Sequence, residues 1–388
     1  MTSLNKKKIC FITGSRAEYG LIERIVELFS KNNSFKTYLI VTGSHLSKKF
    51  GSTVKDISKA NINIKKIPIN LSLDSKKKIY LNQKKLSQEI HKLYKKIKPT
   101  CFVVLGDRFE IFSLCSFIQF LNIPIVHIHG GEKTSGSLDD QLRHCITKMS
   151  HIHFVANEEF KNRVLQLGES KNSVFIVGGL GIDKIERIKI LNKDQIKKKI
   201  NFQENKKNVL VTLHPDTLKD NNTKKMTDLI CKLIKKNKSI NFILTYPNFD
   251  NGYEYIIKKF KYLSKNELNV SFYKSLGDKM YLSLLKYCDV MMGNSSSGFT
   301  EAPYFKIPVL NIGDRQDGRP LSKNIINASI SYSSINNKFM NCLNKSFQMK
   351  MTRVKNEYGK GGASKKIYKI LKKFNFKKDL VKKDFNDL

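Results

Sequence analysis

The sequence places acidic and imidazole side chains directly after short apolar runs. One run ends in Leu105-Gly106-Asp107, and a later one leads through His129 and two glycines to Glu132. A helix-like segment follows and opens with Asp139. Carboxylates and imidazoles set close together hold one another in different protonation states, as general acid–base catalysis requires. We therefore interpret Asp107, His129, Glu132 and Asp139 as a candidate acid–base set.

Two other interpretations of these residues stay open. Asp107 stands where a side chain could cap the next helix. His127 and His129 alternate along a strand-like run, so they would share one face and could form a metal pair, with Asp107 or Glu132 as a third ligand. No H-E-x-x-H or comparable ligand spacing supports a metal site. We therefore expect proton transfer without a metal.

A second group of polar residues has the types and positions that bind anions. Arg16 follows Gly14 at the start of a helical stretch, where backbone N–H groups and the helix dipole favour a phosphate. The alternative is an ion pair with Glu18 at that helix end. Arg143 belongs to the same small set of arginines near predicted strand ends. We predict that Arg16 and Arg143 bind the substrate.

The second half of the chain offers further phosphate ligands. His214 follows the strand-like run 208–212, and Ser295 and Ser296 stand in a loop of small residues that leads into a helix. Such a loop suits a diphosphate, although the serines could instead be an ordinary helix cap. Glu301, about two turns later, could accept the two hydroxyls of a ribose. Arg319 follows the next strand-like run.

The elements that must position these residues repeat one rhythm: a short apolar run, a turn with glycine, then a helical stretch. This rhythm indicates βαβ units and doubly wound parallel sheets. We predict two Rossmann-like α/β domains facing a cleft, over residues 1–180 and 181–363. The lysine-rich stretch 184–207 is interpreted as their connection. A basic helix over 364–388, with Ser364 as its N-cap, is expected to pack back on the first domain. Strands are predicted at 9–13, 37–41, 102–105, 125–128, 153–155, 174–177, 208–212, 242–245, 270–273, 290–292 and 308–312.

The amino-acid composition limits the kinds of partner that this protein is expected to bind. The 388 residues carry a formal net charge of +38, but nearly all of the excess is lysine, with only nine arginines and no tryptophan. Nucleic-acid readers rely on arginine forks, so we expect no nucleic-acid partner. No run of 18 uncharged apolar residues occurs, which predicts no membrane partner. The seven cysteines are widely spaced without a C-x-x-C pair, which predicts a cytoplasmic protein.

The order of seven motifs resembles the UDP-N-acetylglucosamine 2-epimerase family, in particular its hydrolysing branch that feeds sialic and legionaminic acid synthesis. The motifs are GSRAEYG, GDRFE, HGGE, LDDQLRH, LHP, GNSSSGFTEAP and NIGDRQDGR, and the likeness covers about positions 8 to 320. The resemblance implies a GT-B-like arrangement, a UDP-sugar substrate, no redox cofactor and a homodimer. It implies UDP elimination and hydration to the free 2-epimer. A GT-B glycosyltransferase that uses a UDP-sugar donor remains the alternative.

Residue by residue, the resemblance makes Asp107 and Asp139 the catalytic acids and Arg16 a phosphate ligand. It places His214 and the Ser295–Ser296 loop on the diphosphate, Glu301 on the ribose and Arg319 near the phosphates or the sugar. The sequence departs from the family at His129, because members that make N-acetylmannosamine usually read HIEGGE. The form HIHGGE resembles the legionaminic branch, which acts on a UDP-linked 2,4-diacetamido-2,4,6-trideoxy sugar. Whether His129 or Glu132 does the work of the missing glutamate is left open, as is the sugar.

Overall fold

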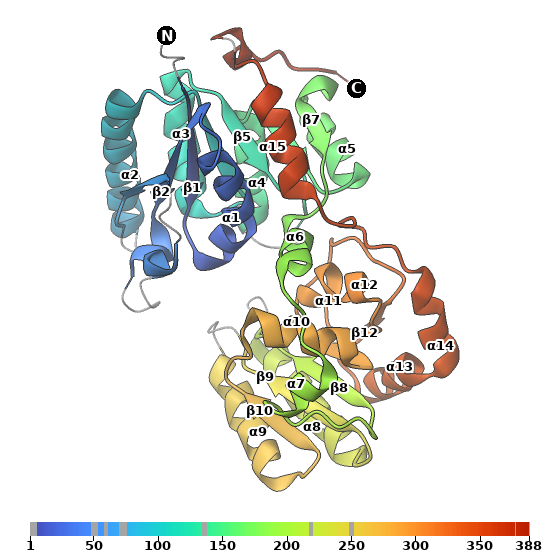
Figure 1. Ribbon diagram of the computed structural model, residues 1–388. Helices are drawn as coiled ribbons and strands as arrows, with labels where there is room; N and C mark the ends of the chain where they lie inside the picture. The colour runs from blue at the N-terminus through green and yellow to red at the C-terminus, as the bar shows by residue number, and fades with distance from the viewer. Residues whose placement is uncertain are drawn as a thin grey trace. The chain divides into compact units, whose positions relative to one another are not determined.

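A computed structural model describes residues 6–47, 53–57, 61–69, 76–133, 138–216, 220–247, 252–376 and 378–387. The chain forms two compact units (Figure 1). Unit 1 consists of Met1–Lys184 and Gly361–Leu388, and unit 2 consists of Ile185–Lys360. Unit 1 is therefore built from both ends of the chain.

Unit 1 holds a seven-stranded parallel sheet. Its strands are β1 (Lys7–Thr13), β2 (Phe35–Val41), β3 (Ile62–Lys66), β4 (Cys101–Leu105), β5 (Ile125–Ile128), β6 (Ile152–Val155) and β7 (Val174–Ile176). Their order is β3-β2-β1-β4-β5-β6-β7, and every pair is parallel. The order reverses between β1 and β4, the place where ligands bind in doubly wound sheets.

Helices cover both faces of this sheet. The helices are α1 (Arg16–Ser30), α2 (Lys76–Ile97), α3 (Phe109–Ile118), α4 (Leu138–Met149), α5 (Glu158–Gln166), α6 (Leu180–Arg187) and α15 (Ala363–Lys373). Helix α6 runs across the boundary between the units. Short 3-10 turns are η1 (Gly43–Leu46), η3 (Thr53–Asp56), η4 (Gln119–Leu121), η5 (Lys171–Ser173) and η7 (Lys378–Val381). Apolar side chains of α1 and α15 pack on one face. Those of α2, α3 and α4 pack on the other.

Helix α15 joins the core of unit 1 beside α1 (Figure 1). Its N-cap is Gly362, so the prediction that Ser364 caps this helix is wrong. The carboxylate of Asp183 takes the place of a cap, because it accepts the backbone N–H groups of Ala363 at 2.9 Å and Ser364 at 2.6 Å. The helix ends at Lys373 and does not run to residue 388 as predicted.

Unit 2 holds a six-stranded parallel sheet in the order β10-β9-β8-β11-β12-β13. Its strands are β8 (Asn208–Thr212), β9 (Asn241–Thr245), β10 (Val270–Tyr273), β11 (Val290–Gly293), β12 (Val309–Ile312) and β13 (Ile325–Ala328). Its helices are α7 (Lys193–Lys197), α8 (Asp220–Lys236), α9 (Tyr253–Asn266), α10 (Gly277–Tyr287), α11 (Ser297–Thr300), α12 (Ala302–Phe305), α13 (Tyr332–Leu343) and α14 (Lys345–Lys350). The 3-10 turn η6 (Met351–Arg353) follows α14. Helices α8, α9 and α13 pack on one face.

The lysine-rich stretch 184–207 does more than connect. Leu191, Ile196, Ile200 and Phe202 are buried and pack with side chains of α10 on the second face of the unit 2 sheet. Their apolar positions are spaced among lysines, which hides them in the overall composition. Among the described residues, no helix is long and apolar enough to cross a membrane.

Candidate active site

The predicted acid–base residues of unit 1 follow β4 and β5, which are neighbours in the sheet, and β1 lies next to β4. Asp107 stands two residues after β4, and His129 directly follows β5. Asp139 lies exposed in the first turn of α4. Arg16 is the exposed first residue of α1. The fold thus brings these motifs to the carboxyl ends of neighbouring strands in the sheet.

Arg143 holds three of these segments together. Its guanidinium is buried, and Nη2 pairs with Oδ2 of Asp107. Nη1 donates to the backbone carbonyl of Glu132 at 2.8 Å and lies 3.5 Å from Oδ1 of Asp140. Asp107 does not cap α3, whose N-cap residue is Arg108. Arg143 therefore fixes the Asp107 carboxylate, a role that sequence reasoning missed, and its predicted contact with substrate stays a prediction.

His129 and Glu132 form a close pair. His129 has a left-handed backbone with φ 65°, which turns the chain out of β5. Its Nδ1 lies 2.6 Å from Oε1 of Glu132, and its Nε2 accepts the backbone N–H of Leu180 at 3.3 Å. Both side chains are mostly buried, with 15% and 13% of their surface exposed. The imidazole is thus held between a carboxylate and the first residue of α6.

His127 and His129 do not form the metal pair that strand alternation suggested. His127 lies in β5 with its ring buried; its Nε2 is 2.8 Å from the Gly106 carbonyl and its Nδ1 is 3.1 Å from Thr147 Oγ1. Burial lowers the pKa of His127 to about 3. Within the described part of the chain, no group of three or more His, Cys, Asp or Glu side chains is arranged to hold a metal ion.

The end of β1 contributes a buried carboxylate that the sequence analysis did not select. Ser15 caps α1 by accepting the Glu18 N–H, and Glu18 Oε2 accepts the Gly14 N–H at 2.7 Å. Glu18 thus closes its own helix end rather than pairing with Arg16. Burial, aided by the nearby carboxylates of Glu110 and Asp107 and opposed by Arg108, raises the pKa of Glu18 to about 7. The sequence signal that could have identified Glu18 was its position in the motif GSRAEYG, four residues after the glycine that follows β1.

In unit 2 the predicted binding residues follow β8, β11 and β12, which are also neighbours. Gly293 ends β11 with φ 137°, and a Cβ there would lie 1.9 Å from the Thr212 carbonyl oxygen. Asn294 is buried, and its side-chain amide bonds both backbone groups of His214, an arrangement we call the Asn294 clamp. Oδ1 of Asn294 accepts the His214 N–H at 2.7 Å, and Nδ2 donates to the His214 carbonyl at 2.9 Å. The Asn294 carbonyl accepts from Gln316 at 2.9 Å. Asn294, not selected from the sequence, therefore sets the spacing of all three loops.

The side chains around this clamp suit an anion. Burial, and secondarily the positive charge of Arg315, lowers the pKa of His214 to about 4, so the ring is neutral near pH 7. Ser296 stands at the N-cap of α11 without a side-chain cap bond, and the cap-like contact to the first residue of this helix comes from Ser295 instead. The Ser295 hydroxyl accepts the Ser297 N–H at 3.3 Å.

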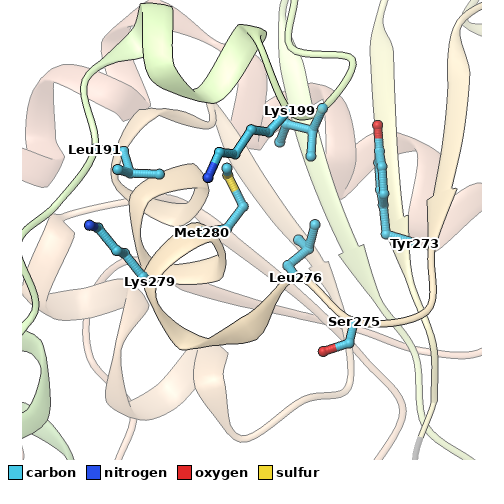
Figure 2. Close-up of a pocket in the computed structure, with 8 residues that line it drawn as sticks. Leu191, Lys199, Tyr273, Ser275, Leu276, Lys279 and Met280 are labelled. Atoms are coloured by element: carbon cyan, nitrogen blue, oxygen red, sulfur yellow. The ribbon is translucent and has the colours of Figure 1, made fainter.

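Glu301 and Arg319 complete the predicted unit 2 set. Glu301 lies at the junction of α11 and α12 and contacts Thr300 Oγ1, so it stands one short helix into the segment and not about two turns. Arg319 donates to the Tyr358 hydroxyl at 3.3 Å. A pocket of about 300 Å³ opens elsewhere in unit 2, beyond β10, and no predicted site residue lines it. Figure 2 shows that polar residues, Lys199 and Lys279 among them, line this pocket together with apolar ones such as Met280.

Comparison with known proteins decides the family. The model for "UDP-N-acetylglucosamine 2-epimerase" matches residues 27–372. The chain belongs to this family. It is 39% identical to the GDP/UDP-N,N'-diacetylbacillosamine 2-epimerase (hydrolyzing) of Campylobacter jejuni, over 84% of this chain and 86% of that protein. It is 34% identical to polysialic acid biosynthesis protein P7 of Escherichia coli, over 98% of each.

The fold agrees with this family. The crystal structure of the UDP-GlcNAc 2-epimerase from Neisseria meningitidis bound to UDP-GlcNAc matches 95% of this chain and 100% of its own, with a TM-score of 0.73 and 21% identity. The predicted family, its hydrolysing branch and the GT-B-like α/β class are therefore confirmed. The glycosyltransferase alternative gains no support from these relatives.

Proposed function

We propose that the chain is a hydrolysing 2-epimerase that releases UDP from a UDP-linked 2,4-diacetamido-2,4,6-trideoxy sugar and yields the free 2-epimer. One observation carries the proposal. At the ends of β4 and β5, Asp107, Arg143, Glu132 and His129 form one connected set of acids and bases. The hydrolysing Campylobacter jejuni relative, named for N,N'-diacetylbacillosamine, supports the substrate class.

The reaction is an elimination followed by a hydration. A base removes the proton from carbon 2, the C–H electrons form the double bond between carbons 1 and 2, and the bond from carbon 1 to the UDP oxygen breaks. Water then adds its oxygen to carbon 1, and a proton reaches carbon 2 from the opposite face. We assign these proton steps to Asp107 and Asp139, with His129 and Glu132 beside them. General acid–base groups contribute roughly 10²–10⁴-fold each.

Unit 2 is proposed to hold UDP. His214, Ser295 and Ser296 would donate to the diphosphate, Arg319 would lie near it, and Glu301 would accept the ribose hydroxyls. In unit 1, Arg16 would meet the charge that develops on the leaving group, and Arg143 is assigned to the binding set as well. Donors already fixed in position stabilise developing charge without reorganising, and the Asn294 clamp supplies that fixity.

The test offers two UDP-sugars side by side to the purified protein. UDP-N,N'-diacetylbacillosamine should give UDP and the free 2-epimer, with water as the only acceptor. UDP-N-acetylglucosamine should react much more slowly. Turnover of UDP-N-acetylglucosamine alone would move the substrate to the N-acetylmannosamine branch and leave the reaction type intact. Release of UDP from neither sugar would overturn the proposed function.

A homodimer and a cytoplasmic location are also proposed. The dimer is typical of the family, and light scattering of the purified protein tests it. All seven cysteines are unpaired, six of them buried, which suits a reducing compartment.

A further inference from the structure

The His129–Glu132 pair has a geometry that distinguishes the two ring nitrogens. At 2.6 Å from a carboxylate oxygen, Nδ1 carries the proton and donates it. At the other end, Nε2 accepts the Leu180 N–H at 3.3 Å, and an acceptor nitrogen must hold a lone pair. Two independent contacts thus specify the same neutral tautomer. The basic atom of the ring is Nε2.

The two contacts differ in strength. The bond to Glu132 is short and charge-assisted, whereas the bond from Leu180 is long for an N–H donor. Glu132 therefore fixes the ring, and the Leu180 contact is the one that a proton from substrate can replace. A carboxylate on Nδ1 also stabilises the imidazolium that forms when Nε2 takes a proton.

The charged and titratable groups around the pair come from several elements. Arg143 of α4 holds the Glu132 backbone, and His127 of β5 lies near His129 with its own ring buried and neutral. Leu180 of α6 presents a backbone N–H. Among these neighbours, Glu132 is the negative group bonded directly to the imidazole.

We propose that Nε2 of His129 accepts the carbon 2 proton in the elimination and that Glu132 is a positioning residue that holds Nδ1–H. This proposal rests on the proposed function and deepens it, because it assigns one step to one atom. The proton passes from carbon 2 to Nε2, the C–H electron pair enters the new double bond, and UDP leaves with the electrons of its bond to carbon 1. This assignment narrows the roles of Asp107 and Asp139, which then serve the hydration and not the removal of the carbon 2 proton. The reverse assignment, with Glu132 as the base and His129 as its donor, is the competing outcome.

The tautomer can be measured without substrate. Nitrogen-15 shifts of the histidine side chains in the ligand-free protein report which ring nitrogen carries the proton, and the signal lost in His129→Gln identifies His129. We expect protonated Nδ1 and unprotonated Nε2. A proton on Nε2 would overturn the proposal, whatever the enzyme is found to act on.

Kinetics separate the base from the residue that positions it. With the sugar that wild type turns over, His129→Gln should lower kcat by about 10³-fold. Glu132→Gln should lower it by roughly 10–100-fold, and the acidic limb of its kcat/KM profile should move to lower pH, because the imidazolium loses its neighbouring anion. Lys133→Gln, an exposed neighbour, is the matched control and should match wild type.

The outcomes are distinct. An unmoved acidic limb in Glu132→Gln would show that Glu132 does not act on the imidazole, and a larger loss of kcat there than in His129→Gln would make Glu132 the base. Either result would overturn the proposal. If wild type releases UDP from neither sugar, the proposed function fails, and the nitrogen-15 measurement still decides the tautomer.

Discussion

The two units carry the same kind of parallel sheet, yet their strand ends are built differently. In unit 1, the groups after β4 and β5 are charged side chains that hold one another, as Asp107 and Arg143 do. In unit 2, the loops after β8 and β11 are held by the close backbone approach of Gly293 to Thr212 and by the neutral side-chain amide of Asn294, which bonds the backbone of His214, and Gln316 after β12 donates to the Asn294 carbonyl. Seven of the eight histidines belong to unit 1, and His214 alone belongs to unit 2.

This difference matches the two kinds of chemistry that we propose for the two units. Proton transfer needs titratable groups whose environments set their protonation states. Binding a diphosphate needs donors that stay in place and do not titrate near pH 7. Changes in unit 1 should therefore affect turnover and its pH dependence, and changes in unit 2 should affect UDP binding and local stability. Substitutions in each unit test that separation.

Asp107→Asn should lower kcat by at least about 10³-fold and leave UDP affinity unchanged, since it removes a proposed proton-transfer group and the charge partner of Arg143. UDP release and calorimetric titration with UDP measure the two quantities. Asp140→Asn is the control, because Asp140 stands at a longer 3.5 Å from Arg143. Near-normal turnover in Asp107→Asn would remove Asp107 from the mechanism.

Gly293→Ala should destabilise unit 2 by about 3 kcal/mol or more, because the φ of 137° is unfavourable for alanine and the new Cβ would meet the Thr212 carbonyl. Gly277→Ala has a positive φ but open space around its Cβ, so it should cost only about 1–2 kcal/mol. Denaturant midpoints of the unit 2 transition compare them. Equal losses would mean that the close approach at Gly293 is unimportant.

Arg319→Gln should weaken UDP binding by roughly 10–100-fold, the worth of one charge-assisted hydrogen bond, with a smaller change in kcat. Lys323→Gln, a nearby exposed cation, should bind UDP like wild type. Calorimetric titration with UDP measures both variants. If Arg319→Gln instead lost kcat at unchanged affinity, the separation of roles between the units would fail.

Glu18→Gln should change how stability depends on pH. The pKa of Glu18 is about 7 in the folded state, above its usual value, so its contribution is present at low pH and is lost as the pH rises toward 7. Between pH 5 and 8, the free energy of unfolding of the variant should therefore rise relative to that of wild type by about 2 kcal/mol. Glu27→Gln on the same helix is the control, because hydrogen bonds from Lys31 and Arg24 lower the pKa of Glu27 to about 2. Its effect should be constant over this range, and denaturant unfolding at several pH values compares the two.

The sequence predicted the central strands and missed two at the edges. Strands β1, β4 and β5 are continuous apolar runs because both faces of a parallel sheet are covered. Strands β3 and β13 lie at sheet edges and read INIKK and IINA, with partly exposed side chains. Without a continuous apolar run, the pattern gave no signal for either strand.

Side-chain partners were harder to predict than the motifs that contain them. Arg143 and Asp107 are 36 residues apart in sequence, and only the sheet order brings them together. The expected pairing of His127 and His129 failed because β5 ends at Ile128 and His129 takes a left-handed conformation. Ser364 failed as a cap because Asp183, about 180 residues earlier, supplies the carboxylate. Local spacing holds no information about such distant partners.

Unit 1 is built from two separate segments of the chain, which affects the order in which the units can fold during synthesis. Ile367 and Leu371 of α15 are fully buried in the core that contains β1 and α1. Residues 185–360 form a continuous unit that is complete before those two side chains leave the ribosome. Domains generally fold as units during synthesis. Unit 1 therefore acquires its finished core only after the whole of unit 2 has been synthesised.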